Sequence, residues 1–120
     1  HHGVVASAVA VKSADEISPK FQVGCMILGV PNYPLTAMPA EVLKAMEQDR
    51  QNLFFADVHA RGEYPTYMNR FFKENDIKLN ITDEDKDILK NTVDFISFSY
   101  YMSSCATADP EKNQKGNLIG

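Results

Sequence analysis

The chain has 120 residues, of which 44% are hydrophobic and 23% are charged, and its 12 Lys and Arg against 16 Asp and Glu give a formal net charge of -4. This composition is ordinary for a globular domain, and the length is too short for two domains. The excess of acidic residues does not fit the basic surface of a nucleic-acid binder. The apolar runs are too short to predict a membrane span, and the N-terminus lacks the pattern of a signal sequence. We therefore expect a cytoplasmic protein.

The first half of the chain predicts a helix, a buried strand and a long helix. His1 and His2, which are either native or the remnant of a tag, run into an Ala- and Val-rich segment up to about residue 15. Its apolar residues recur at helical spacing with few polar positions, which predicts a mostly buried helix. Residues 21–28 form an unbroken apolar run, as in a parallel strand buried on both faces. Pro39 then fits the first position of an amphipathic helix of about twenty residues.

The second half predicts two short helices, a strand and a loop. The turn sequence GEYP ends the long helix, and TYMNRFFKEND predicts a short one. Thr82 is followed three residues later by Asp85, the pattern of a capping box at a helix start. VDFISFSYY is a second apolar, β-branched and aromatic strand. Residues 105–120 are small and polar without periodicity, so we expect an exposed loop there.

This order of elements favours the α/β class. Strands that are unbroken apolar runs and are separated by helices predict a parallel sheet with right-handed crossovers. Two strands alone would both be edges, and strands this apolar need neighbours. The chain therefore has the pattern of a piece of a larger α/β fold.

Several side chains could carry chemistry, but most have a simpler interpretation. Asp57, His59 and Glu63 lie close together, yet a metal-binding helix usually supplies two histidines, so a solvated helix end is the favoured interpretation. Cys25 sits in an apolar run and is expected to pack as a small hydrophobe. With Cys105 it makes neither a disulfide framework nor a zinc set.

The strand ends are the expected place for a site. Ligands of α/β proteins bind beyond the carboxyl ends of the parallel strands. Tyr100 and Tyr101 follow the second strand, and LGVPNYP follows the first. A tyrosine there can donate a hydrogen bond to a carboxylate or a sugar hydroxyl. The alternative, that both rings only fill the rim of a core, stays open at this point.

Four blocks of the sequence carry a family likeness: HHGVVASAVAVK, FQVGCMILGVPNYPLT, NLFFADVHARGEYPTYM and TVDFISFSYYMS. In this order and spacing they resemble the middle of glycoside hydrolase family 1, most closely its bacterial 6-phospho-β-glucosidases. The resemblance implies a partial (β/α)8 TIM barrel. Residues 1–104 would then be a central barrel segment, with strand five at 21–28 and strand six at 95–99.

The resemblance also implies a function. Members are retaining glycosidases that use two carboxyl groups about 5 Å apart, with no metal or organic cofactor. The protein would hydrolyse 6-phospho-β-glucosides to glucose 6-phosphate and an aglycone. The family's glutamates lie in Asn-Glu-Pro and Glu-Asn-Gly motifs, and neither motif occurs in these 120 residues. The segment alone is therefore predicted to be inactive.

One residue at the end of the second strand carries over from the family, and another departs from it. Tyr101 matches the tyrosine that donates a hydrogen bond to the nucleophilic glutamate, and Tyr100 would pack into the barrel wall. Ser99 stands where many members have Asn, and is the candidate substrate contact. Glu63 lies in a turn that the family does not use for chemistry.

Other functions remain open from the sequence. The chain could be a stand-alone α/β interaction module, or part of a β-glucosidase that acts on unphosphorylated sugars. In either case the apolar strands of an isolated segment need cover, so we expect self-association, and no nucleic-acid or membrane partner.

Overall fold

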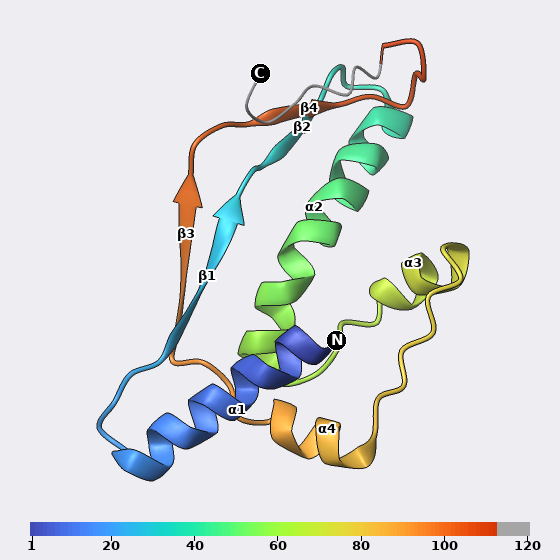
Figure 1. Ribbon diagram of the computed structural model, residues 1–120. Coiled ribbons are helices and arrows are strands. Elements are labelled where there is room, and N and C mark those ends of the chain that lie inside the picture. The colour runs from blue at the N-terminus through green and yellow to red at the C-terminus, as the bar shows by residue number, and fades with distance from the viewer. Residues whose placement is uncertain (113–120) are drawn as a thin grey trace. The chain divides into compact units, whose positions relative to one another are not determined.

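The computed structural model describes residues 1–112 (Figure 1). Its helices and strands, in chain order, are α1 (His2–Ile17), β1 (Gly24–Gly29), β2 (Asn32–Pro34), α2 (Pro39–Arg61), α3 (Met68–Glu74), α4 (Asp83–Leu89), β3 (Phe95–Tyr100) and β4 (Ser104–Ala106). Every helix predicted from the sequence is present, as are both predicted strands. The chain divides into two compact units, one formed by residues 1–28 and 53–99 and the other by 29–52 and residues from 100 on.

The first unit contains the sheet that the sequence predicted. β1 and β3 are hydrogen-bonded neighbours, and their arrows point the same way in Figure 1, so the pair is parallel. Asp94 fixes how the strands start: its side chain accepts a hydrogen bond from Val23 N at 2.8 Å, and its own N–H donates to Val23 O at 2.8 Å. Val93 N donates to His59 O at 3.0 Å, which ties the start of β3 to the last turn of α2.

The core of this unit is built by three helices. Val4 and Ala8 of α1, Val58 of α2 and Leu89 of α4 form one buried cluster. Within this cluster, α1 and α4 are in direct contact. Phe54 and other half-buried side chains pack against the cluster. Burial of these aliphatic groups is the main stabilising contribution in the unit.

Gly62 is required where α2 ends. Its φ of 73° lies in the left-handed region, and its N–H donates to Val58 O at 2.9 Å. A Cβ at this position would lie 2.8 Å from Leu89 O. A side chain here would be strained by the backbone angle and by contact with the end of α4.

The capping box predicted at Thr82 is present. Asp85 N donates to Thr82 Oγ1 at 3.1 Å, and Thr82 N donates to Asp85 Oδ2 at 2.9 Å. The hydrogen bond from the Thr82 backbone is the largest cause of a lowered pKa at Asp85. The His1 ring lies 3.2 Å from the same carboxylate and 3.2 Å from the Tyr64 hydroxyl. His1 is therefore part of the packed unit.

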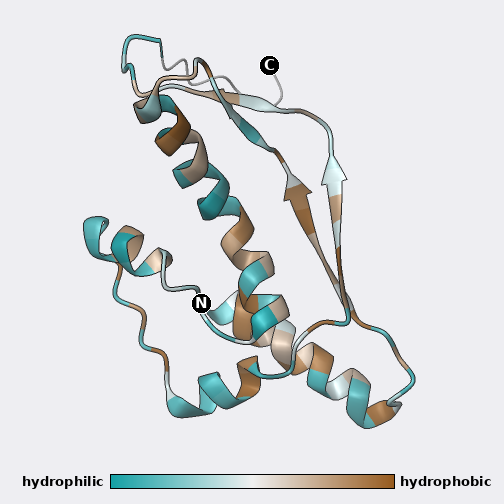
Figure 2. Cartoon of the chain, turned by 180° about the vertical axis from the view of Figure 1, so that it is seen from behind, coloured by the Kyte–Doolittle hydropathy of each residue, from teal (hydrophilic) through white to brown (hydrophobic). Residues whose placement is uncertain are grey.

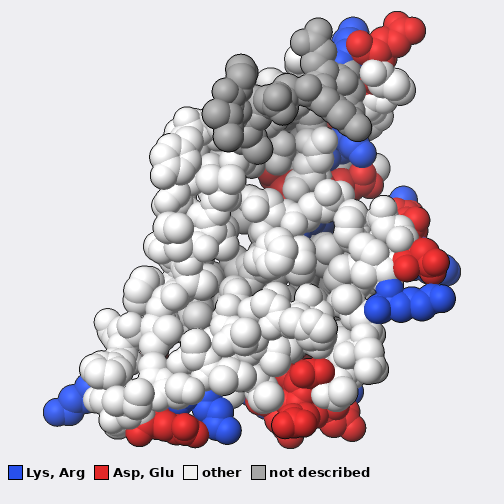
Figure 3. Space-filling model, viewed as in Figure 1, with Lys and Arg blue, Asp and Glu red and all other residues white. Residues whose placement is uncertain are grey.

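The predicted burial of the first helix and of both strands is wrong for this chain. Val9 is 42% exposed, Met26 70% and Phe98 70%. Figure 2 shows that β1 is strongly hydrophobic, and the surface over β1 and β3 in Figure 3 has no charged side chains. Within residues 1–112, β1 and β3 pair only with each other, so each keeps one unpaired edge and exposed side chains.

The second unit contains a small sheet that the sequence did not predict. β2 and β4 are parallel, with Asn32 opposite Ser104, Tyr33 opposite Cys105 and Pro34 opposite Ala106. Ser104 N donates to Pro31 O and Leu35 N donates to Ala106 O, each at 3.0 Å, so the pairing extends beyond the short strands at both ends.

The expected exposed loop at 105–120 needs correction at its start. β4 runs to Ala106, which is 1% exposed, and the following Thr107 is 8% exposed. The reason is that backbone pairing with β2 satisfies the polar groups of this segment and lets its small side chains pack. Residues 113–120 of the expected loop lie outside the described residues. None of the helices in residues 1–112 has the length and hydrophobicity of a membrane span.

Candidate functional site

The carboxyl ends of β1 and β3 lie at the same edge of their sheet because the two strands are parallel (Figure 1). Ser99, near the end of β3, is partly buried. Its Oγ lies 3.3 Å from the sulfur of Met26 in β1 and donates to it. A thioether is a weak acceptor, so this contact leaves the hydroxyl able to exchange to a better partner.

The two tyrosines at the end of β3 differ in their surroundings. The Tyr100 hydroxyl lies 3.0 Å from Ser103 Oγ, across the turn that leads to β4. Tyr101 is 79% exposed, and Tyr100 is 59% exposed. The interpretation that both rings fill the rim of a core therefore does not hold in this chain. Of the two side chains, that of Tyr101 is the more exposed to solvent.

A buried carboxylate, Glu41, lies in the second unit of the chain. Glu41 lies in the first turn of α2 and is 8% exposed. Oε2 accepts from Thr36 Oγ1 at 2.5 Å and Thr36 N at 2.6 Å, and Oε1 accepts from Thr107 Oγ1 at 3.0 Å. The Thr36 hydroxyl is the largest cause of a lowered pKa at Glu41. Because both of its oxygens already accept hydrogen bonds from Thr36 and Thr107, this carboxylate stabilises the local structure and is poorly suited to proton transfer.

A second carboxylate fixes the start of β2. Asp49 Oδ1 accepts from Asn32 N and from Asn32 Nδ2, each at 2.9 Å. Asp49 lies two turns after Glu41 on α2, so one helix holds both ends of the β2 segment. Neither carboxylate stands out in the sequence. The only local signal is the Thr36 to Glu41 spacing, which is compatible with a loop that folds back on a helix start.

The structure does not bring Asp57, His59 and Glu63 into one site. Asp57 accepts from the Tyr67 hydroxyl and lies 3.3 Å from Arg61 Nε. His59 is half-buried, and burial lowers its pKa, while Glu63 is exposed. Among residues 1–112 there is no group of three or more His, Cys, Asp and Glu side chains that could hold a metal.

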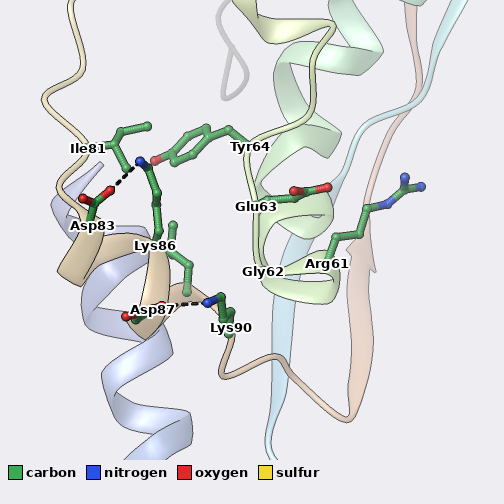
Figure 4. Close-up of a pocket in the computed structure, with 10 residues that line it drawn as sticks. Arg61, Gly62, Glu63, Tyr64, Ile81, Asp83, Lys86, Asp87 and Lys90 are labelled. Atoms are coloured by element: carbon green, nitrogen blue, oxygen red, sulfur yellow. Dashed lines mark hydrogen bonds and ion pairs between the residues drawn. The ribbon is translucent and has the colours of Figure 1, made fainter.

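A pocket lies beside the end of α2 in the first unit (Figure 4). Two ion pairs on α4 and its C-cap residue Lys90 line it: Lys86 Nζ lies 2.7 Å from Asp83 Oδ1, and Lys90 Nζ lies 2.6 Å from Asp87 Oδ1. Exposed ion pairs of this kind are weak and are screened by solvent. The pocket is formed at helix ends and not at the carboxyl ends of the strands, so it is not the candidate site.

The fold places the chain in the class of α/β barrels. The solved GH1 β-glucosidase of Exiguobacterium antarcticum B7 matches with a TM-score of 0.74 at 20% identity, over 88% of this chain and 24% of that one. A β-glucosidase of Exiguobacterium marinum matches with a TM-score of 0.77 at 21% identity, over 93% of this chain and 26% of that one. The predicted α/β fold, a segment of a (β/α)8 barrel, is confirmed.

The model of glycosyl hydrolase family 1 matches residues 1–118, and the chain belongs to this family. It is 62% identical to a 6-phospho-β-glucosidase of Clostridium longisporum, over 99% of this chain and 26% of that protein. It is 52% identical to a 6-phospho-β-glucosidase of Dickeya chrysanthemi, over the same shares. The chain thus spans about a quarter of the length of the curated relatives it matches. The family predicted from the sequence is confirmed.

Proposed function

We propose that the protein carrying this segment is a retaining glycosidase that hydrolyses 6-phospho-β-glucosides to glucose 6-phosphate and an aglycone. The observation that supports this most is the 62% and 52% identity to proteins named 6-phospho-β-glucosidases. A phosphorylated sugar delivered by a phosphotransferase uptake system is formed inside the cell, so the proposal includes a cytoplasmic location. It requires no metal or organic cofactor, because two carboxyl groups carry the reaction.

In this proposal the segment supplies support to the nucleophile. Neither catalytic glutamate motif occurs in the 120 residues, so both carboxyl groups come from elsewhere in the protein. The Tyr101 hydroxyl donates to the nucleophilic carboxylate. A hydrogen bond to the charged form lowers the carboxylate's pKa and fixes its direction of attack. Ser99, whose hydroxyl lies against the Met26 sulfur, is the candidate contact to substrate.

The substrate class is tested with the full-length protein and two chromogenic β-glucosides that differ only in the 6-phosphate. A site built to bind a charged group rejects an analogue that lacks it by about 100-fold or more. We therefore expect kcat/KM to be higher for the phosphorylated compound by at least about that factor. Equal values, or a preference for the unphosphorylated compound, would favour the β-glucosidase alternative.

The phosphorylated substrate is favoured by the comparisons. A β-glucosidase A of Acetivibrio thermocellus is 26% identical to this chain, against 62% for the Clostridium longisporum 6-phospho-β-glucosidase. The stand-alone interaction module has no comparable support, because the family match runs through residues 1–118.

Self-association of the isolated 120-residue chain is the remaining part of the proposal. Met26 and Phe98, each 70% exposed, lie on strands that keep an open edge within the described residues. A second copy can cover such a surface, and covering it stabilises the pair. Sedimentation velocity over a concentration series should show dimers or larger species. A single monomeric species at every concentration would contradict this expectation.

A further inference from the structure

We infer that Glu41 is a positioning residue that holds the turn carrying Tyr101 in place, although it touches no reacting atom. The inference rests on the proposed function, because it concerns the residue that supports the nucleophile there. It is carried by the second unit of the chain alone, in which Glu41, β2, β4 and Tyr101 all lie.

The position of Tyr101 is tied to that of β4. Only Met102 and Ser103 separate Tyr101 from the first residue of β4. Ser104 N donates to Pro31 O at 3.0 Å, and the Tyr100 hydroxyl lies 3.0 Å from Ser103 Oγ. A shift of β4 along β2 would therefore move the turn and the Tyr101 ring with it.

Glu41 is the group that fixes β4 from its other end. Thr107, directly after β4, donates its hydroxyl to Glu41 Oε1 at 3.0 Å and accepts a hydrogen bond from Asp109 N at 3.1 Å. The opposite carboxylate oxygen holds the chain just after β2, through the backbone and side chain of Thr36. One carboxylate thus joins the ends of β2 and β4 to the first turn of α2.

The charge of Glu41 suits this role. Three donors converge on it, and an ionised carboxylate accepts at both oxygens without donating. The Thr36 hydroxyl does most to lower its pKa, and Lys112 contributes further. The first turn of a helix also favours a negative charge. In Glu41→Gln one oxygen becomes an NH₂ group, which cannot accept from the donors placed there.

The test uses the full-length protein with Glu41→Gln, Tyr101→Phe and the double variant. Glu47→Gln is the matched control, because Glu47 lies on the same helix and forms an exposed ion pair with Lys44, at 3.9 Å. We expect Glu41→Gln to lower kcat about tenfold and to raise the pKa of the acidic limb of kcat/KM, as Tyr101→Phe does. The double variant should match Tyr101→Phe, because the two changes act on the same contact. Glu47→Gln should match the wild type.

A merely structural role would give another pattern. Glu41→Gln would then lower the melting temperature while kcat and the acidic limb stayed at wild-type values, and that result overturns the inference. A double variant whose loss of kcat combines the full losses of both single variants also overturns the inference. If Glu41→Gln does not fold, Thr107→Val removes one donor, and an unchanged acidic limb in that variant also overturns it. A wild-type protein that does not cleave 6-phospho-β-glucosides would instead refute the proposed function.

Discussion

Replacing Tyr101 by Phe in the full-length protein should lower kcat/KM about 10- to 150-fold. A hydrogen bond to a charged group is worth about 1.5–3 kcal/mol, which corresponds to that range of rates. In the proposed function, the variant loses the hydroxyl that would keep the nucleophile ionised and correctly oriented, while the aromatic ring remains. The acidic limb of the pH profile should move to higher pH, because the nucleophile's pKa rises when the donor is removed.

The neighbouring tyrosine supplies the control. The Tyr100 hydroxyl lies against Ser103 within the turn, so Tyr100→Phe removes only a neutral hydrogen bond. Its kcat/KM should fall by less than about tenfold, with the acidic limb unmoved. If Tyr100→Phe shifts the limb and Tyr101→Phe does not, the two tyrosines have been assigned the wrong way round.

Local signals predicted the helices well. The capping box at Thr82 and Asp85, and the start of α2 at Pro39, agree with the structure. Such features depend on residues within one helical turn, so they can be recognised in the sequence. The two apolar runs likewise predicted β1 and β3, which pair as expected.

Long-range pairing escaped prediction. β2 and β4 each have three residues, and some 70 residues separate Asn32 from its partner Ser104. Neither segment is an apolar run, because backbone hydrogen bonds carry much of the pairing. Glu41 was missed for the same reason: its donor Thr107 is distant in sequence, and a glutamate at a helix start usually faces solvent.

Burial was overestimated for a different reason. The apolar composition of β1 and β3 suits strands of a complete barrel, in which helices cover the outer face of the sheet and side chains fill the interior. This chain spans about a quarter of the length of its relatives, so Met26 and Phe98 remain largely exposed. The role proposed for Tyr101 rests on the family likeness. Geometry adds that its ring is open at the strand end.

The isolated chain of 120 residues should have no glycosidase activity. Retaining hydrolysis needs an acid to protonate the leaving oxygen and a carboxylate to attack the anomeric carbon. The segment has neither family glutamate motif. Its buried carboxylate Glu41 is held by Thr36 and Thr107, with its pKa lowered, so it cannot serve as the acid. The loss relative to the full-length protein should be complete.

The most direct measurement follows product release from a chromogenic 6-phospho-β-glucoside, with the full-length protein and the 120-residue chain assayed in parallel. Circular dichroism of the short chain shows whether its helices are present. We expect turnover by the full-length protein and none above the buffer blank by the segment. Turnover that rises in proportion to the concentration of the segment would contradict it.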